Sequence, residues 1–287
     1  MANISETLKK ATVILRRSGI AEPRREAGSL LSFVLEKDKT YLIAYPEYEL
    51  TQEETERFSE VLKRRAGREP FQHITGRQEF YGLDFFVSKD VLIPRPETEM
   101  LVEEAMAILS RTKDPRFAEV GVGSGCIAVS ILRNLRSARA VGLDLSAEAL
   151  RVAERNARTH GVFERLELEE SNVFEALRNK LKSSTPFDLI VSNPPYIPAE
   201  DFARLQPEVG RFDPEVALTD GRDGLSIIRK IVRRSPQFLK PGGFLLLEIG
   251  IGQADEVRAM FAPKIWSSVE IRPDLQGIPR MVKGSRF

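Results

Sequence analysis

The sequence of 287 residues predicts an α/β fold, in which a mostly parallel sheet of seven strands follows a small helical bundle and a β-hairpin. Three observations predict it. Apolar residues recur at helical spacing through the first ~75 residues. Aromatic and β-branched residues then gather around a single glycine. From Arg116 onward, short apolar segments alternate with helical ones, which is typical of parallel sheets with helices on both faces.

Residues 1–75 should form the helical bundle. Gly19 ends the first helix, and Pro23 suits the first turn of the second. Thr51 and Glu54 form a capping-box pattern ahead of a third helix, which Gly67 ends. The apolar residues that repeat at helical spacing are Ile4, Leu8, Ala11, Leu15, Ala27, Leu30, Leu31, Val34, Phe58, Val61 and Leu62. Acidic and basic residues balance in this part, so we expect it to pack on or recognise a protein.

Residues 76–94 predict a β-hairpin that links the two domains. Gly82 is the expected turn residue. The aromatic residues on either side of it are Phe80, Tyr81, Phe85 and Phe86. The segment Pro94-Arg95-Pro96 then breaks the chain before a helix over residues 97–110, so the second domain should span residues 95–287.

The second domain should be Rossmann-like. Its expected strands cover residues 116–120, 138–143, 166–169, 189–192 and 244–249, with two more near 269–272 and 280–282. Helices lie between them, for example over residues 147–159 with Ser146 as N-cap. Ligands of such sheets bind beyond the carboxyl ends of the strands. The residues that directly follow strands are therefore the candidate site residues.

Composition excludes several classes of protein. The net charge is +1, so the basic surplus typical of nucleic-acid binders is absent and we expect no direct nucleic-acid binding. No apolar run approaches the ~18–20 residues that span a bilayer. One cysteine and two histidines leave no internal disulfide and no expected metal site. We expect a cytoplasmic monomer that does not enter membranes.

A glycine-rich loop joins the first expected strand to a helix. Its site residues are Glu119, Gly121, Val122, Gly123, Ser124 and Gly125. Glycines there permit a tight turn and close approach of a ligand to the backbone. The next strand ends at Asp144, where a carboxylate can accept hydrogen bonds from ribose hydroxyls. Together, the glycine-rich loop and Asp144 predict a nucleoside-containing cofactor. Nicotinamide enzymes share this layout, but their usual spacing is G-x-G-x-x-G, and here it is G-x-G-x-G.

The segment Asn193-Pro194-Pro195-Tyr196 follows the fourth expected strand and carries the candidate catalytic residues. An amide or aniline-like NH2 group is a poor nucleophile because its lone pair is delocalised. The Asn193 side-chain oxygen and the Pro194 carbonyl can each accept one N–H and favour a tetrahedral nitrogen. Proline stiffens the segment, and Tyr196 can stack on a flat group. Fixed carbonyl dipoles also stabilise the positive charge that moves to the nitrogen during methyl transfer from a sulfonium.

The order of these motifs resembles the class I amino-methyltransferases, which act on DNA adenine N6, RNA guanine N2 or protein glutamine N5. Two further segments resemble the peptide-chain release factor glutamine methyltransferases: REPFQHITG over residues 68–76 and VLIPRPETE over residues 91–99. The segment Arg24-Arg25-Glu26-Ala27 is also similar to that family. The resemblance covers nearly the whole chain.

This resemblance implies a class I methyltransferase domain with an N-terminal substrate-recognition domain. It implies transfer of a methyl group from S-adenosyl-L-methionine to N5 of the glutamine in the Gly-Gly-Gln motif of release factors, in translation termination, with S-adenosyl-L-homocysteine as product. Cofactor contacts are implied for the glycine loop, Asp144, Asn193, and Asn172 with Val173. Two positions depart from the family pattern: Glu119 stands where Asp is more usual, and Val173 where some members carry an aromatic residue.

Other functions stay open at this point. The chain could methylate nucleic-acid amino groups, or the glutamine of a ribosomal protein. A catalytically silent module that docks on translation factors is a candidate of another class, although the intact Asn193–Tyr196 segment argues against it. A nicotinamide dehydrogenase is the most distant alternative.

Overall fold

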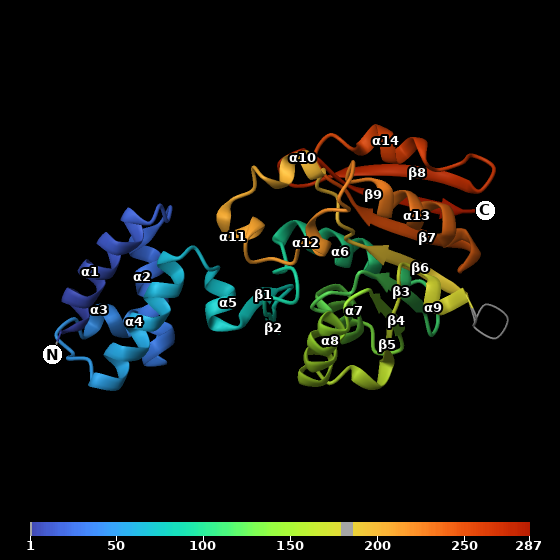
Figure 1. Cartoon of the computed structure of the whole chain (residues 1–287). Coiled ribbons are helices and arrows are strands. Elements are labelled where there is room, and N and C mark those ends of the chain that lie inside the picture. The colour runs from blue at the N-terminus through green and yellow to red at the C-terminus, as the bar shows by residue number, and fades with distance from the viewer. Residues whose placement is uncertain (1, 179–185) are drawn as a thin grey trace. The chain divides into compact units, whose positions relative to one another are not determined.

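The computed structural model describes residues 2–178 and 186–287. They form two compact units (Figure 1). The helical unit consists of Met1–Gly76 together with Gln206–Phe212, and the sheet unit consists of Arg77–Leu205 and Asp213–Phe287. The chain thus leaves the sheet unit once, contributes seven residues to the helical unit and returns.

The helical unit is built around three longer helices, as predicted: α1 (Ile4–Arg17), α2 (Pro23–Leu35) and α4 (Gln52–Ala66). The predicted capping box of Thr51 and Glu54 is present at the start of α4. The apolar residues expected in the core are buried, apart from Leu8, which is partly buried. Two short helices, α3 (Lys39–Ala44) and α5 (Phe71–Thr75), were not predicted because six and five residues are too few to show a helical period.

Ion pairs hold the inserted segment within the helical unit. It contains the short helix α11 (Pro207–Gly210). Glu208 accepts hydrogen bonds from Arg68 at 2.6 Å and from Arg65 at 3.2 Å. The Arg65 side chain, only 6% exposed, also binds Glu26 on α2. Removing Glu208 would leave a buried guanidinium with fewer acceptors, which is costly.

The predicted hairpin is present and packs into the sheet unit. Strands β1 (Arg77–Phe80) and β2 (Leu83–Phe86) pair in antiparallel fashion. Tyr81 and Gly82 between them both have positive φ, as the favoured two-residue hairpin turn requires. Phe80 and Phe85 are fully buried in the same core as helix α6 (Glu99–Leu109).

The main sheet has seven strands in the order β5-β4-β3-β6-β7-β9-β8. They are β3 (Arg116–Val120), β4 (Arg139–Asp144), β5 (Leu166–Glu170), β6 (Phe187–Ser192), β7 (Leu239–Glu248), β8 (Trp266–Pro273) and β9 (Pro279–Arg286). All neighbours are parallel except β9, which runs antiparallel to β7 and β8. The predicted Rossmann-like, mostly parallel sheet is confirmed. β7 begins earlier than residue 244 because Pro241, Gly242 and Gly243, which suggested a loop, lie inside an irregular strand.

Helices cover both faces of the sheet, and side chains alternate between two cores. On β3, Phe117 packs in one core and Ala118 in the other. The first core includes α6, α7 (Cys126–Asn134) and α8 (Ala147–Thr159), and the second includes α13 (Ser226–Arg234) and α14 (Ala254–Ala259). The remaining short helices are η1 (Pro96–Thr98), η2 (Phe163–Arg165), α9 (Glu175–Arg178), α10 (Ala199–Phe202), α12 (Glu215–Leu218) and η3 (Ser235–Gln237). Within residues 2–178 and 186–287, no helix is both long and apolar enough to cross a bilayer.

Candidate active site

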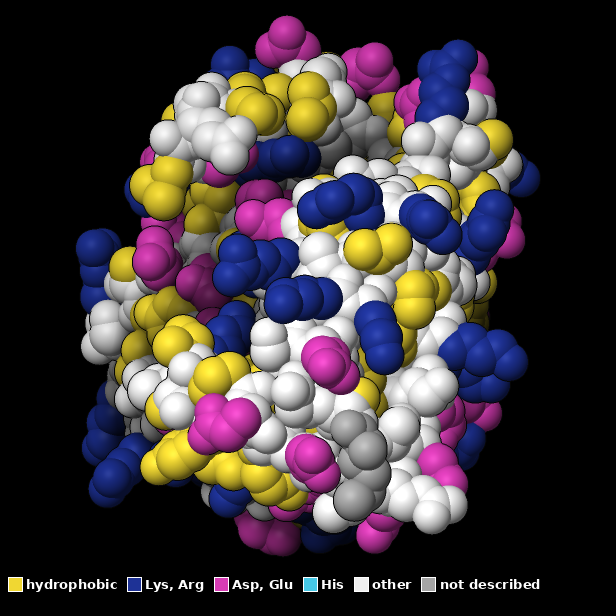
Figure 2. Space-filling model, turned by 90° about the vertical axis from the view of Figure 1, so that its left-hand side faces the viewer, with side chains coloured by type: hydrophobic (Ala, Val, Ile, Leu, Met, Phe, Trp, Pro, Cys, Tyr) yellow, Lys and Arg dark blue, Asp and Glu magenta, His cyan; other side chains and the backbone are white. Residues whose placement is uncertain are grey.

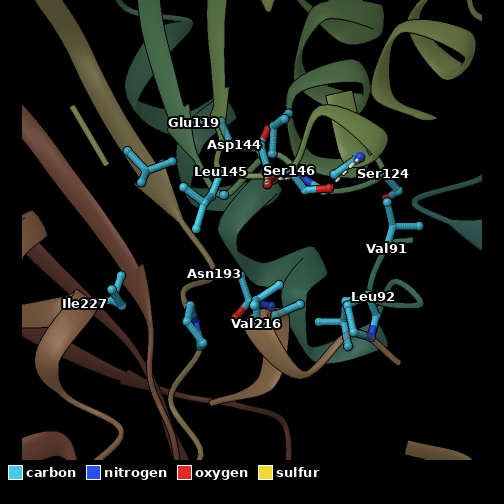
Figure 3. Close-up of a pocket in the computed structure, with 18 of the residues that line it drawn as sticks. Val91, Leu92, Glu119, Ser124, Asp144, Leu145, Ser146, Asn193, Val216 and Ile227 are labelled. Atoms are coloured by element: carbon cyan, nitrogen blue, oxygen red, sulfur yellow. Dashed lines mark hydrogen bonds between the residues drawn. The ribbon is translucent and has the colours of Figure 1, made fainter. Parts of the chain in front are cut away.

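A cavity of about 490 Å3 lies beyond the carboxyl ends of β3, β4 and β6, within the sheet unit (Figure 3). This is where ligands of such sheets bind. The predicted site residues that line it are Glu119, Gly121, Val122, Gly123, Ser124, Asp144, Asn172, Val173, Asn193 and Pro195. Three other predicted residues, Gly125, Pro194 and Tyr196, do not line it.

The glycine loop connects β3 to α7 and is held against β4. The backbone N–H groups of Gly121 and Val122 both donate to the carbonyl of Leu143. Gly123 has φ +52°, and a Cβ added there would meet no atom within 4 Å, so a ligand has room to approach. A Cβ on Gly125 would instead lie 3.3 Å from Ala153, so this glycine permits α7 to pack closely on α8.

Asp144 is the last residue of β4 and is held by two backbone donors. Its Oδ2 accepts from the N–H of Gly123 at 2.8 Å, and its Oδ1 accepts from that of Ser146 at 3.0 Å. Burial raises the pKa of this carboxyl. Each oxygen keeps a second lone pair for a ligand donor. The geometry suits two adjacent hydroxyl groups.

Glu119 is 1% exposed and supports the loop from below. Its Oε2 accepts from the N–H of Ala128 at 2.8 Å, in the first turn of α7. A carboxylate is favoured at a helix N-terminus, although burial raises its pKa well above the usual range. The longer side chain of Glu, compared with Asp, still reaches the cavity wall and this helix.

Asn193 directly follows β6, and the nitrogen of its side-chain amide is hydrogen-bonded within the protein. The Nδ2 group donates to Thr98 Oγ1 at 3.1 Å, and Thr98 donates in turn to Glu248 Oε2 at 2.7 Å. Among the described residues, no donor reaches Asn193 Oδ1 or the Pro194 carbonyl oxygen. Asn193 lines the cavity, so its side-chain oxygen is available to a ligand there, whereas Pro194 does not line it.

Tyr196 is fixed on the side away from the cavity. Its hydroxyl lies 3.4 Å from Glu248 Oε1, and its carbonyl accepts from Gln253 Nε2 at 2.9 Å. Gln253 Oε1 accepts from the N–H of Gly250, so this side chain clamps two loops together. Burial and the nearby Glu248 raise the pKa of Tyr196. In this structure the phenol ring contributes to rigidity and does not line the cavity.

Comparison with known proteins identifies the family. Residues 6–76 match the PrmC N-terminal domain, and residues 97–204 match the methyltransferase small domain. A release factor glutamine methyltransferase from Geobacter sulfurreducens is 44% identical over 94% of this chain and 92% of its own. One from Koribacter versatilis is 39% identical over 99% and 98%. The chain belongs to the release factor glutamine methyltransferase family.

The fold agrees with this membership. A methyltransferase from Pyrococcus furiosus superposes with a TM-score of 0.52 and 14% identity, covering 80% of this chain and 98% of its own. At that identity the likeness concerns the fold alone. It agrees with the mostly parallel, helix-covered sheet predicted from the alternating strands and helices.

Several residues of this family member's site were missed by sequence reasoning. Leu145, which is 60% exposed, lines the cavity directly after Asp144. Leu92, Val216 and Ile227 add further apolar wall. The signal for Leu145 was its position directly after Asp144, beyond the carboxyl end of an expected strand, where ligands of such sheets bind. The other three come from distant segments, and no local pattern brings them together.

Val173, whose role the sequence left in doubt, has an unusual backbone. It is 6% exposed, lines the cavity and has φ +60°. This conformation is strained for a β-branched residue, and strain of this kind gathers at functional sites. In this family member the position supplies a small apolar contact instead of an aromatic ring.

Proposed function

We propose that this chain transfers a methyl group from S-adenosylmethionine to N5 of the glutamine in the Gly-Gly-Gln motif of peptide-chain release factors. The observation that carries the proposal is the placement of Asn193. Its amide nitrogen is bound to Thr98, and its oxygen stays available in the cavity that Asp144 also lines. The full-length relatives named release factor glutamine methyltransferase support the choice of substrate.

The cavity residues fit the cofactor. Asp144 offers two oxygens to ribose hydroxyls, and Gly123 leaves its backbone accessible. Val122, Leu145 and Val173 provide an apolar surface for a flat base. The volume of about 490 Å3 lies in the range of small-molecule sites. When bound, S-adenosylmethionine supplies an electrophilic methyl group on a sulfonium.

The chain's own residues activate the glutamine. Asn193 Oδ1 and the Pro194 carbonyl would each accept one N–H of the substrate amide, which turns the nitrogen lone pair out of conjugation. Both dipoles stabilise the positive charge that develops on nitrogen more than they stabilise the neutral amide. The methylated nitrogen is acidic and loses its proton without a general base. Alignment of the substrate nitrogen with the methyl group and the sulfur supplies the rest of the rate enhancement.

Mass spectrometry of a release factor after incubation with enzyme and S-adenosylmethionine tests the proposal. We expect a single added methyl group on the glutamine of the Gly-Gly-Gln motif. A release factor with that glutamine replaced by alanine is the control and should stay unmodified. A methyl group at another residue would refute the proposed substrate. So would the absence of any methylation by an enzyme that binds S-adenosylhomocysteine.

Asp144→Ala should weaken binding of S-adenosylhomocysteine by roughly 10- to 100-fold. Hydrogen bonds to a charged group contribute ~1.5–3 kcal/mol, and one such net loss corresponds to that range. Isothermal titration calorimetry measures the effect. Glu148→Ala is the matched control, because Glu148 is an exposed acid on the neighbouring helix that does not line the cavity. Equal affinities of the two variants would remove Asp144 from the cofactor site.

We also propose that the helical unit docks the release factor through a groove between α1, α2 and α3. Its floor is apolar, with Leu8, Val13 and Ile43 among the lining residues. Ile43 is 80% exposed. The charged lining residues are Lys9, Arg16, Arg24, Arg25, Lys39 and Glu22. With five basic residues and one acidic residue, the groove favours binding of a release-factor surface that is acidic and also carries apolar side chains. Figure 2 shows the face on the side of these helices, where Lys and Arg side chains lie among exposed hydrophobic ones.

Adjacent lysines and arginines on α1 allow a matched test. Lys9 and Arg16 line the groove, whereas the exposed Lys10 and Arg17 do not. We expect Lys9→Glu with Arg16→Glu to raise KM for an intact release factor at least 5-fold at low salt, with kcat unchanged. Lys10→Glu with Arg17→Glu should have a smaller effect, since net charge changes equally but the groove is intact. Equal effects of the two pairs would contradict the groove.

A further inference from the structure

Glu248 is a buried carboxylate next to the catalytic segment. It ends β7 and is 2% exposed. Thr98 donates to its Oε2 at 2.7 Å, and the Tyr196 hydroxyl lies 3.4 Å from its Oε1. Within the described residues, no Lys or Arg forms an ion pair with it. The charged groups that act on it are Arg280 on β9, which favours its charge, and Glu97 on η1, which opposes it.

Stability alone does not account for this charge. Burial raises the pKa of the Glu248 carboxyl to about 7. A buried carboxylate without a cation partner is unfavourable. A glutamine of the same shape could contact both Thr98 and Tyr196 without the charge. The negative group therefore calls for a functional explanation.

The hydrogen-bond direction provides one. An ionised carboxylate only accepts, so the single hydroxyl proton of Thr98 must point to Glu248. The Thr98 oxygen is then left with lone pairs only and can accept solely from the NH2 group of Asn193. The Asn193 amide cannot turn by half a circle without losing that bond. Its oxygen is thereby kept on the free side.

We propose that Glu248 is a positioning residue that acts through Thr98 to keep the oxygen of Asn193, and not its NH2 group, facing the substrate nitrogen. This inference rests on the proposed glutamine methylation. A reversed Asn193 amide would present donors to the substrate NH2 group and would repel it. Glu248 also contacts the Tyr196 hydroxyl, so the same carboxylate reaches one end of the Asn193–Tyr196 segment directly and the other end through Thr98.

Glu248→Gln tests the inference with almost no change of shape. The glutamine can donate to Thr98, and Thr98 can then donate to Asn193 Oδ1, which permits the wrong amide orientation. We expect kcat to fall about 10-fold, while KM and the affinity for S-adenosylhomocysteine change less than 2-fold. Protonation of Glu248 should act on the wild type in the same way, so its kcat should fall below pH 7. The kcat of the Glu248→Gln variant should not show this fall below pH 7.

Thermal stability separates positioning from folding. The contribution of Glu248 to the stability of the wild type should fall as pH rises from about 4.5 to above 7, because the unfolded chain ionises Glu248 first and the folded chain then carries a buried charge. Glu248→Gln has no such charge, so its Tm should equal or exceed that of the wild type at pH 8. A variant that is equally stable and yet slower would show that the carboxylate serves the reaction.

Thr98 provides an independent arm. Thr98→Val removes the relay and should lower kcat by a similar factor, whereas Thr98→Ser keeps the hydroxyl and should retain most activity. The double variant Glu248→Gln/Thr98→Val should be no slower than Thr98→Val alone, because both changes break one chain of hydrogen bonds. Glu104→Gln, at a buried carboxylate paired with Arg272 and Lys283, is the matched control and should leave kcat and its pH profile unchanged.

The outcomes distinguish this inference from the function on which it rests. A wild type that methylates no glutamine refutes the proposed function. An active wild type, together with Glu248→Gln of equal kcat and unchanged pH profile, refutes the positioning role alone. Additive losses in the double variant would also overturn it, since Glu248 and Thr98 would then act separately.

Discussion

Replacing Asn193 by alanine should lower kcat for glutamine methylation roughly 30- to 1,000-fold. This corresponds to about 2–4 kcal/mol of lost transition-state stabilisation, by analogy with removal of one oxyanion-hole donor. The alanine cannot accept from the substrate amide, and it also leaves Thr98 without its donor. Single-turnover kinetics with a saturating release factor measure the chemical step directly.

The companion measurements for Asn193→Ala define its role. Asn134→Ala, at an exposed asparagine near the end of α7, is the matched control and should behave as the wild type. Binding of S-adenosylhomocysteine should change far less than kcat if Asn193 acts on the substrate amide. A normal methylation rate for Asn193→Ala would show that the Asn193 side chain takes no part in the chemical step.

Gly224→Ala should reduce kcat/KM by about 100-fold or more. A Cβ at this position would lie 2.2 Å from the carbonyl oxygen of Tyr196 and 2.8 Å from its carbon. Backbone cannot yield as a flexible side chain does, so the Asn193–Tyr196 segment must shift. A misplacement of about 1 Å at reacting groups can cost 10²-fold in rate. Steady-state kinetics with a release factor and a melting curve give the two necessary readouts.

Gly242→Ala controls for backbone strain in that experiment. Gly224 and Gly242 have φ of +74° and +76°, so alanine is equally disfavoured at both. A Cβ on Gly242 would meet no atom within 4 Å, and this residue lies in β7 away from the cavity. Both variants should lose stability, but only Gly224→Ala should lose activity. Equal kinetics would show that the contact with Tyr196 does not shape the site.

The sequence predicted those parts of the site that follow strands directly. Asp144 and Asn193 stand at strand ends, and the glycine loop joins a strand to a helix, so a local pattern was enough to bring them to one edge. Thr98 and Glu248 are 150 positions apart in the chain. Their contact depends on β6 and β7 being neighbours and on where η1 lies. No local sequence pattern predicts either of these.

The same distinction applies to the fold. Helices α1, α2 and α4 have enough turns to show an apolar face, and they were predicted. Both caps of α4, Thr51 and Gly67, were predicted with it, whereas the N-cap Asn3 of α1 and the C-cap Glu36 of α2 were not. Helices α3 and α5 are too short for that. The insertion of residues 206–212 into the helical unit could not be predicted, since Glu208 finds Arg65 and Arg68 across about 140 residues of sequence.

The insertion of residues 206–212 determines how such proteins can be divided into fragments. A catalytic fragment that begins at Arg77 would keep Glu208 but lose both arginines that neutralise it. A chimera carrying another helical bundle must therefore exchange two stretches of sequence, not one. The helical unit is discontinuous in the sequence, and a single crossover point cannot transfer it whole.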